Sequence, residues 1–121
     1  MFEKKYRVVF VAASAILASG FAAGAASAKD GCGGASWYAL HSKTASGERM
    51  NPARLTAAHR SLRFGTKLRV TNNRNGRAVV VRVNDRGPFI RGRVLDLSRA
   101  AANSIGMVKS GTAKVCYEII G

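Results

Sequence analysis

The sequence predicts a small, mainly β domain: a closed barrel of short strands with one short helix. Three observations support this fold class. Several short segments alternate apolar and polar residues, as strands with one buried face do. Gly, Asn and Pro separate these segments into compact turns, and only one stretch carries the start and stop signals of a helix.

Residues 1–28 are predicted to be a secretory signal peptide. A positive segment, Lys4 to Arg7, precedes an apolar run that starts at Val8, and Ala26-Ser27-Ala28 is a small-x-small cleavage site. An uncleaved membrane anchor is the alternative, because the run approaches spanning length. Its second half is Ala, Gly and Ser, which are weakly apolar, so cleavage is favoured. We expect an exported protein of the bacterial periplasm or cell envelope, without a stable membrane span after cleavage.

Residues 29–121 are predicted to form one strongly basic domain. The whole chain has a formal net charge of +14, and removal of Lys4, Lys5, Arg7 and Glu3 leaves 17 of 20 cations and five of six acids, which gives +12. Such a balance usually indicates nucleic acid, but export argues against that partner. An exported basic domain is better suited to an acidic polymer such as cell-wall glycan, or to an anionic membrane surface. The alternative is that the charge only keeps the protein soluble.

The two cysteines, Cys32 and Cys116, are expected to form a disulfide. A lone pair in an exported chain is most simply a disulfide, since the compartment is oxidising. It would join the N-terminal arm, which contains Asp30, to the last strand, and so long a loop stabilises by roughly 3–5 kcal/mol in the chain-entropy model. The alternative, a lipid-modified N-terminal Cys32, fits poorly because Lys29-Asp30-Gly31 lacks the apolar residue that lipoprotein processing expects.

The first half of the domain is expected to contain an aromatic strand, a polar loop and a β-hairpin. The strand covers residues 35–39, and the loop runs from 41 to 50 with Gly47 as its turn residue. Residues 67–70 then alternate polar and apolar side chains, and residues 77–83 form a β-branched run. Between these two strands, residues 72–76 form a turn in which Asn75-Gly76 supplies positive φ angles.

The C-terminal part is expected to contain two more strands and the helix. Residues 94–97 form a short strand, and Ser98 is a suitable N-cap for a helix over residues 99–105. Gly106 closes the helix. Residues 113–120 alternate again and form the last strand.

Six sequence blocks match a known family in their order along the chain. They are Ala35-Ser36-Trp37-Tyr38, Thr44-Ala45-Ser46-Gly47-Glu48, Leu55-Thr56-Ala57-Ala58-His59, Phe64-Gly65-Thr66, Val81-Arg82-Val83-Asn84-Asp85-Arg86-Gly87-Pro88-Phe89 and Asp96-Leu97-Ser98. With these blocks the chain closely resembles the RlpA-like (rare lipoprotein A) family over about residues 34–120. The resemblance implies a six-stranded double-psi β-barrel, a fold related to expansins and to some barrel-type endoglucanases.

The resemblance also implies an activity. Several members of that family are lytic transglycosylases, which cut peptidoglycan strands and prefer glycan stripped of stem peptides. We therefore expect peptidoglycan glycan strands as the partner, no cofactor and a monomeric protein. Many members carry a lipobox cysteine and a C-terminal domain that binds denuded septal glycan. This sequence has no convincing lipobox and stops at Gly121, so septal targeting does not follow from the resemblance.

The chemistry of such an enzyme needs few residues. Cleavage of a glycosidic bond needs a proton on the leaving oxygen, and a hydrolase usually needs a second carboxyl group. In a lytic transglycosylase, the C6 hydroxyl of the N-acetylmuramoyl residue attacks its own anomeric carbon. One carboxyl group can then donate the first proton and accept the second. The product ends in a 1,6-anhydro ring.

The leading candidate for this carboxyl group is Asp85. It follows a strand and precedes Gly87-Pro88, so it can face a groove, and the resemblance makes it the catalytic acid with Glu48 and His59 in support. The alternative is that Asp85 forms an ion pair with Arg82 or Arg86. An adjacent cation would favour the ionised carboxylate, whereas a general acid must hold its proton.

The other candidates have structural alternatives as well. Asp96 corresponds to a catalytic acid in some related endoglucanases, but it could instead lock the helix N-terminus beside Ser98. Glu48 could be a solvated loop acid. His59 could be a half-buried histidine whose hydrogen bonds are satisfied. No His or Cys spacing fits a metal site, and no phosphate-binding loop is present.

Substrate binding is assigned to aromatic and basic residues. Trp37 and Tyr38 alternate across a strand, so one ring is expected to face out and could stack on a sugar, although core packing is the commoner fate of Trp. Arg86, Arg91 and Arg93 could bind the lactyl carboxylate of a muramoyl unit, or could form a solvated face. Two functions remain open: an endolytic peptidoglycan transglycosylase, or a non-catalytic, expansin-like module that binds cell-wall glycan.

Overall fold

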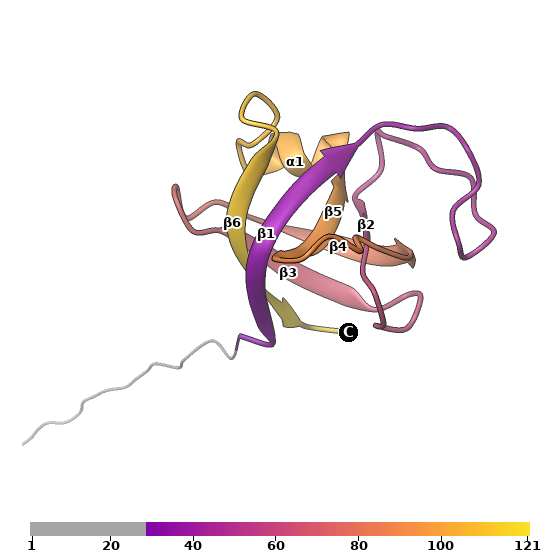
Figure 1. Ribbon diagram of the computed structural model, residues 1–121, viewed down its shortest axis with the longest axis horizontal. Coiled ribbons are helices and arrows are strands. Elements are labelled where there is room, and N and C mark those ends of the chain that lie inside the picture. Colours follow the sequence, from indigo (N-terminus) through magenta and orange to yellow (C-terminus); the bar gives the residue numbers. More distant parts are fainter. Residues whose placement is uncertain (1–28) are drawn as a thin grey trace, which may run out of the picture.

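The structure is a computed structural model that describes residues 29–121, and these residues form a closed six-stranded β-barrel with one short helix (Figure 1). The predicted signal peptide, residues 1–28, lies outside the described residues. The elements are β1 (Gly31–Tyr38), β2 (Thr56–Ala58), β3 (Lys67–Asn72), β4 (Ala78–Asp85), β5 (Arg93–Ser98), α1 (Arg99–Ser104) and β6 (Thr112–Ile119). Around the barrel the order is β1-β5-β2-β4-β3-β6, and β6 pairs with β1 to close it.

The predicted hairpin is present as β3 and β4, which pair antiparallel. Gly76 has a φ of +74° and donates its N–H to the Asn72 carbonyl at 2.8 Å. The expectation that Asn75 also takes a positive φ was wrong, because within residues 29–121 only glycines do so. The connection between Asn72 and Arg77 is longer than a two-residue turn, so a single left-handed residue suffices to reverse the chain.

The helix begins where its cap was predicted. Ser98 Oγ accepts the Ala101 N–H at 3.2 Å, and Ile105 is the C-cap. Gly106 follows with a φ of +71°, which lets the chain leave the helix. The helix covers one end of the barrel, where its buried residues Ala101 and Ala102 pack into the core (Figure 1).

Strand β1 begins earlier than predicted and includes the segment expected to be an arm. Gly31 to Gly34 pair with β6, and the two strands lie side by side in Figure 1. Asp30 is fixed as well, because its N–H donates to the Tyr117 carbonyl at 2.8 Å. Cys32 lies opposite Cys116 in this register, and the predicted disulfide between them is confirmed. The alternative of a lipid-modified Cys32 is therefore excluded, since the sulfur is already bonded.

The core follows the alternation of the strands. Side chains that point into the barrel are fully buried, and each such aliphatic side chain stabilises the fold by about 1.5–3 kcal/mol relative to exposure. They are Leu68, Val70, Val81, Val83, Leu95, Leu97 and Val115. Between β1 and β2, residues 39–55 form a long excursion that projects from one side of the barrel (Figure 1). No helix within residues 29–121 has the length and apolarity needed to cross a membrane.

Candidate active site

The barrel places two of the candidate acids on either side of its shortest strand. Ala58 of β2 pairs with Asp85 of β4 on one side and with Asp96 of β5 on the other. Since neighbouring strands lie about 4.8 Å apart, the backbones of the two acids are about 10 Å apart. Sequence patterns did not predict β2, because three buried residues are too few to show an alternation.

A register shift orients Asp85. Ala57 pairs with the buried Val83, but Ala58 pairs with Asp85 rather than with Asn84. An extra residue in one strand turns the following side chains to the other face. The shift therefore places Asp85, which would otherwise follow the alternation into the barrel, on the outer face and leaves it half-buried.

The Asp85 carboxylate accepts hydrogen bonds from uncharged groups. Its Oδ1 accepts the backbone N–H of Ala45 at 2.8 Å and that of Arg86 at 2.9 Å. Its Oδ2 accepts the Tyr38 hydroxyl at 2.8 Å. Tyr38 at the end of β1 and Ala45 in the loop after it are 47 and 40 residues away from Asp85 in the sequence, and both bind this side chain.

The alternative that Asp85 is an ion-pair residue is wrong for the two predicted cations. Arg82 binds Glu48 instead, with N···O distances of 2.8 and 3.0 Å. The Arg86 guanidinium donates to the carbonyls of Leu62 at 2.8 Å and His59 at 3.2 Å, and it lies 4.0 Å from the centroid of the Phe64 ring. Arg86 therefore holds the turn after β2, and its guanidinium has less freedom for substrate than the sequence suggested.

Glu48 is a fixed anion rather than a solvated loop acid. The fork of Arg82 binds both carboxylate oxygens, and Asn84 Nδ2 donates to Oε1 at 3.2 Å. These hydrogen bonds, that of Arg82 above all, lower the pKa of Glu48 to about 2. Glu48 is therefore ionised at neutral pH and can stabilise positive charge or hold the loop, but it cannot supply a proton.

Asp96 lies in a different environment. The Ser36 hydroxyl donates to its Oδ1, and Arg93 forms an ion pair with the same oxygen at 3.5 Å. Ser36 also accepts a hydrogen bond from Arg93, so the three side chains form one cluster across β1 and β5. The N-cap role belongs to Ser98, and Asp96 takes no part in it.

His59 is buried and both of its ring nitrogens are occupied. Nδ1 accepts the backbone N–H groups of Ser61 at 3.0 Å and Leu62 at 3.1 Å, so the proton lies on Nε2, which faces the Tyr117 hydroxyl at 2.9 Å. Burial, aided by the charges of Arg60 and Arg86, lowers the pKa of His59. Its backbone N–H donates to the Asp85 carbonyl at 3.1 Å, but no hydrogen bond within residues 29–121 joins the imidazole to a candidate acid.

The two predicted aromatic residues have different neighbours, and neither is fully exposed. Trp37 packs against the core and donates Nε1–H to the Val108 carbonyl at 3.1 Å. Tyr38 points to Asp85, and burial together with the hydrogen bond to Asp85 raises its pKa well above the ordinary value. Tyr38 is therefore a protonated hydroxyl at neutral pH, available to donate to the acid.

One contributor was missed from the sequence. Asn84 is 2% exposed, and while its amide nitrogen binds Glu48, its buried Oδ1 has no partner among the described residues. The signal that could have identified Asn84 is its position inside the sequence block 81–89, which matches the family. Asn84 connects the loop carrying Glu48 to β4, directly beside Asp85.

All five acids of residues 29–121 have hydrogen-bond partners. Besides the three discussed, Asp30 Oδ2 accepts the Ile119 N–H at 2.6 Å, and Glu118 pairs with Arg69 at 2.8 Å. Three of the five, Glu48, Asp96 and Glu118, bind an arginine. The part of the chain that the structure describes contains no group of three or more His, Cys, Asp and Glu side chains that could hold a metal.

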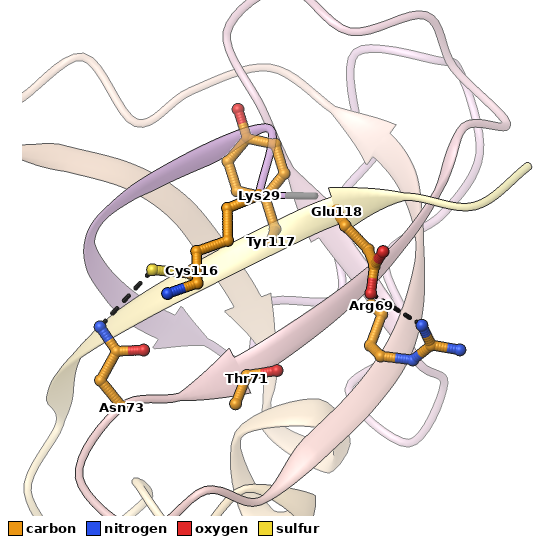
Figure 2. A pocket seen from close by; sticks show the side chains of 7 residues that line it. All are labelled: Lys29, Arg69, Thr71, Asn73, Cys116, Tyr117 and Glu118. Atoms are coloured by element: carbon orange, nitrogen blue, oxygen red, sulfur yellow. Dashed lines mark hydrogen bonds and ion pairs between the residues drawn. The ribbon is translucent and has the colours of Figure 1, made fainter. Parts of the chain in front are cut away.

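Two hollows help to locate the site. One is lined by residues of the loop after β1, including Glu48, Arg49 and Arg54, and Glu48 is the one candidate catalytic residue in its lining. The other lies on the outer side of β3 and β6 (Figure 2) and is lined by Lys29, Arg69, Thr71, Asn73, Cys116, Tyr117 and Glu118. In Figure 2 Asn73 and Cys116 are joined, as are Arg69 and Glu118, and the second hollow contains none of the candidate catalytic residues.

Comparison with known proteins identifies the family. A family model described as "Lytic transglycolase" matches residues 30–117. The chain belongs to this family. The predicted resemblance is confirmed, and the site around Asp85 lies entirely within the matched residues.

Curated relatives carry a consistent name. The protein called "Probable endolytic peptidoglycan transglycosylase RlpA" of Nostoc sp. is 67% identical over 78 residues, which cover 64% of this chain and 21% of that protein. The protein of the same name from Synechocystis sp. is 57% identical over 89 residues, covering 71% of this chain and 28% of that one. The chain thus spans less than a third of the length of these relatives.

Solved structures confirm the predicted double-psi β-barrel. The Streptomyces papain inhibitor superimposes with a TM-score of 0.63 at 19% identity, over 77% of this chain and 97% of that one. The apo-expansin of Clavibacter michiganensis gives 0.60 at 24% identity, over 74% and 50%. A mutant of this expansin in complex with cellohexaose gives 0.58 at 26% identity, over the same shares.

Proposed function

We propose that this chain is an endolytic lytic transglycosylase of peptidoglycan, with Asp85 as its general acid and base. The observation that carries the proposal is the setting of Asp85: a half-buried carboxylate on the outer face of the barrel, bound by a hydroxyl and two backbone N–H groups and by the guanidinium of neither Arg82 nor Arg86. Membership of the lytic transglycolase family and the names of the relatives support the reaction class.

The first step is proton donation. The Asp85 proton would sit on Oδ2, where the Tyr38 hydroxyl can change from donor to acceptor. Asp85 gives this proton to the glycosidic oxygen as the bond from that oxygen to the anomeric carbon of the muramoyl unit breaks. The positive charge that develops on this sugar is offset by the carboxylate that Asp85 leaves behind.

The second step closes the ring. The C6 hydroxyl of the muramoyl unit bonds to its own anomeric carbon and loses its proton to Asp85. The acid is thereby restored, no water is consumed, and the product ends in 1,6-anhydro-N-acetylmuramic acid. A single carboxyl group suffices because the same residue serves first as acid and then as base.

Glu48 and His59 are then positioning residues. Glu48 joins the loop after β1 to Arg82 and Asn84 of β4, which places the Ala45 N–H on Asp85. His59 holds the turn after β2, and its N–H fixes the last carbonyl of β4. Neither residue is needed as a proton donor in the two steps above.

The proposal includes the setting of the protein. Residues 1–28 act as a signal peptide, and residues 29–121 work as a monomer on peptidoglycan strands in the cell envelope. Glycan without stem peptides is the proposed substrate. The disulfide supports an oxidising compartment, and the basic charge suits the lactyl carboxylates of such a strand.

A non-catalytic, expansin-like glycan-binding module is the second candidate. The observation in its favour is the likeness to the expansin solved with cellohexaose. The same barrel can serve either function, so the fold does not separate them.

Product analysis tests the proposal. The purified protein is incubated with denuded glycan strands, and the released fragments are identified by mass spectrometry. Fragments ending in 1,6-anhydro-N-acetylmuramic acid are expected. Reducing ends alone would make the protein a hydrolase, and retained binding without release would support the module.

A further inference from the structure

The loop between β4 and β5 presents an exposed aromatic ring. Gly87 and Pro88 are buried, but the next two side chains turn outward: Phe89 is 77% exposed and Ile90 57%. An aromatic side chain with this exposure is a candidate contact for a ligand, because its ring offers a large apolar face to solvent.

The loop ties this ring to the acid. Asp85 is the last residue of β4, and the loop crosses the end of β2 to reach β5, the strand that carries Asp96. A Cβ added at Gly87 would lie 3.6 and 3.8 Å from two ring carbons of Phe89. The ring therefore lies next to the backbone of Gly87, two residues after Asp85.

The other aromatic rings of residues 29–121 already have partners. Trp37 packs against the core, and Tyr38 binds Asp85. Phe64 carries the Arg86 guanidinium, and Tyr117 is buried against His59. The sequence assigned sugar stacking to Trp37 or Tyr38, but Phe89, at 77% against 42% for Phe64, is the most exposed ring of residues 29–121.

We infer that Phe89 is the platform for a sugar ring of the bound glycan, and this inference rests on the proposed function. The face of an aromatic ring is negative, and the axial C–H groups of a pyranose are weakly positive, so the two surfaces attract each other as their apolar areas leave water. A sugar seated on Phe89 would have its glycosidic oxygen held near Asp85. Because the ring is uncharged, it does not bind the lactyl carboxylates of the glycan, and arginine side chains would bind them instead.

Ile90 is a matched control. It is adjacent and also exposed, but it lines a separate hollow with Gly34, Arg91 and Lys114. If stacking on the ring provides the affinity, removal of the Phe89 ring should weaken glycan binding. Removal of a neighbouring apolar side chain that has no ring should leave glycan binding unchanged. Val80, 40% exposed on the outer face of β4, serves as a distant control.

The experiment measures the affinity of denuded glycan fragments for the full chain. Asp85→Asn prevents cleavage, and Phe89→Leu, Phe89→Trp, Ile90→Ala and Val80→Ala are added to it one at a time. Loss of the aromatic contact should weaken the binding of Phe89→Leu by about two- to thirteenfold. Phe89→Trp should retain the affinity, and the two control variants should bind as the parent does.

The outcomes separate the platform from the activity. Equal affinity of Phe89→Leu and its parent, or an equal loss in Ile90→Ala, overturns the platform while cleavage by the unmodified protein still supports the function. Absence of both cleavage and binding overturns the two together. Sedimentation with anionic lipid vesicles provides the remaining arm: if Phe89→Leu loses vesicle binding but keeps its glycan affinity, the ring contacts a membrane and the inference is wrong.

Discussion

Asp85 and Asp96 lie on either side of Ala58, yet they differ in the charge of their partners. Asp96 binds the Arg93 guanidinium and the Ser36 hydroxyl, so one of its partners is a cation. Asp85 binds the Tyr38 hydroxyl and two backbone N–H groups. Two carboxylates in similar positions thus have different environments: Asp96 is held by a cation between β1 and β5, whereas all the hydrogen-bond partners of Asp85 are uncharged groups.

The largest expected effect comes from Asp85→Asn. The amide keeps the shape of the side chain but has no transferable proton, so cleavage should fall by about 10²–10⁴-fold. Release of anhydro-terminated fragments measures the rate, and circular dichroism with thermal unfolding checks that the fold is intact. A folded Asp85→Asn protein that still cuts would remove Asp85 from the chemistry.

Asp96→Asn should lose stability rather than activity. The ion pair with Arg93 is about a quarter exposed, so its loss together with the hydrogen bond should reduce the free energy of unfolding by about 1 kcal/mol. Urea unfolding measures this change, and the cleavage rate should remain near that of the unmodified protein. If the folded variant is inactive while Asp85→Asn still cuts, the roles of the two acids are reversed.

Tyr38→Phe tests the partner that distinguishes the two acids. Without the hydroxyl, Asp85 loses a hydrogen bond worth about 1.5 kcal/mol, so kcat should fall by about tenfold while KM is retained. Steady-state kinetics on denuded glycan separates the two constants. A rise in KM at unchanged kcat would make Tyr38 a substrate-binding residue, as the sequence first indicated.

The smallest effect concerns the histidine beside the Asp85 backbone. The folded pKa of His59 is below its ordinary value of 6.5, so the unfolded chain binds the proton first as the pH falls. The contribution of His59 to stability is complete above pH 6.5 and declines below it, by at most about 1.4 kcal/mol per pH unit. The pKa of Glu48 is about 2 against an ordinary 4.5, so the stability that Glu48 contributes declines only below about pH 4.5.

Urea unfolding at pH 7.5 and 5.5 measures the contribution of His59. His59→Asn should make the stability less dependent on pH in this interval, and His41→Asn, in the exposed loop, should not. Both variants should keep most of their cleavage rate if His59 only positions the turn. A His59→Asn protein that folds normally but loses cleavage would place His59 with Asp85 in the chemistry.

Local features of the fold could be predicted from the sequence, and long-range ones could not. The turn at Gly76 and the cap at Ser98 depend on neighbouring residues, so their patterns were visible. Strand β2 is three residues long and exists because β4 and β5 pair with it on both sides. The glycine-rich start of β1 has no strand pattern of its own and is held by β6.

The candidate site shows the same division. The sequence identified Asp85 but associated it with Arg82 and Arg86, its neighbours along the chain. In the barrel these side chains point elsewhere, because alternation and the register shift after Val83 separate them. The actual partner, Tyr38, is 47 residues away, and only the closed barrel brings it to Asp85.

The excess of cations over acids has a consequence for the rate of encounter. Residues 29–121 hold 17 lysines and arginines, of which three are paired with Glu48, Asp96 and Glu118. The remaining cations act together as a long-range field, which can raise the association rate with an anionic polymer by about 10–10³-fold. At physiological ionic strength this field decays over about 8 Å, so added salt would slow capture without altering the bond-breaking step. A protein of this kind would stay close to an anionic strand between encounters and search along it, rather than return to bulk solution after each failed collision.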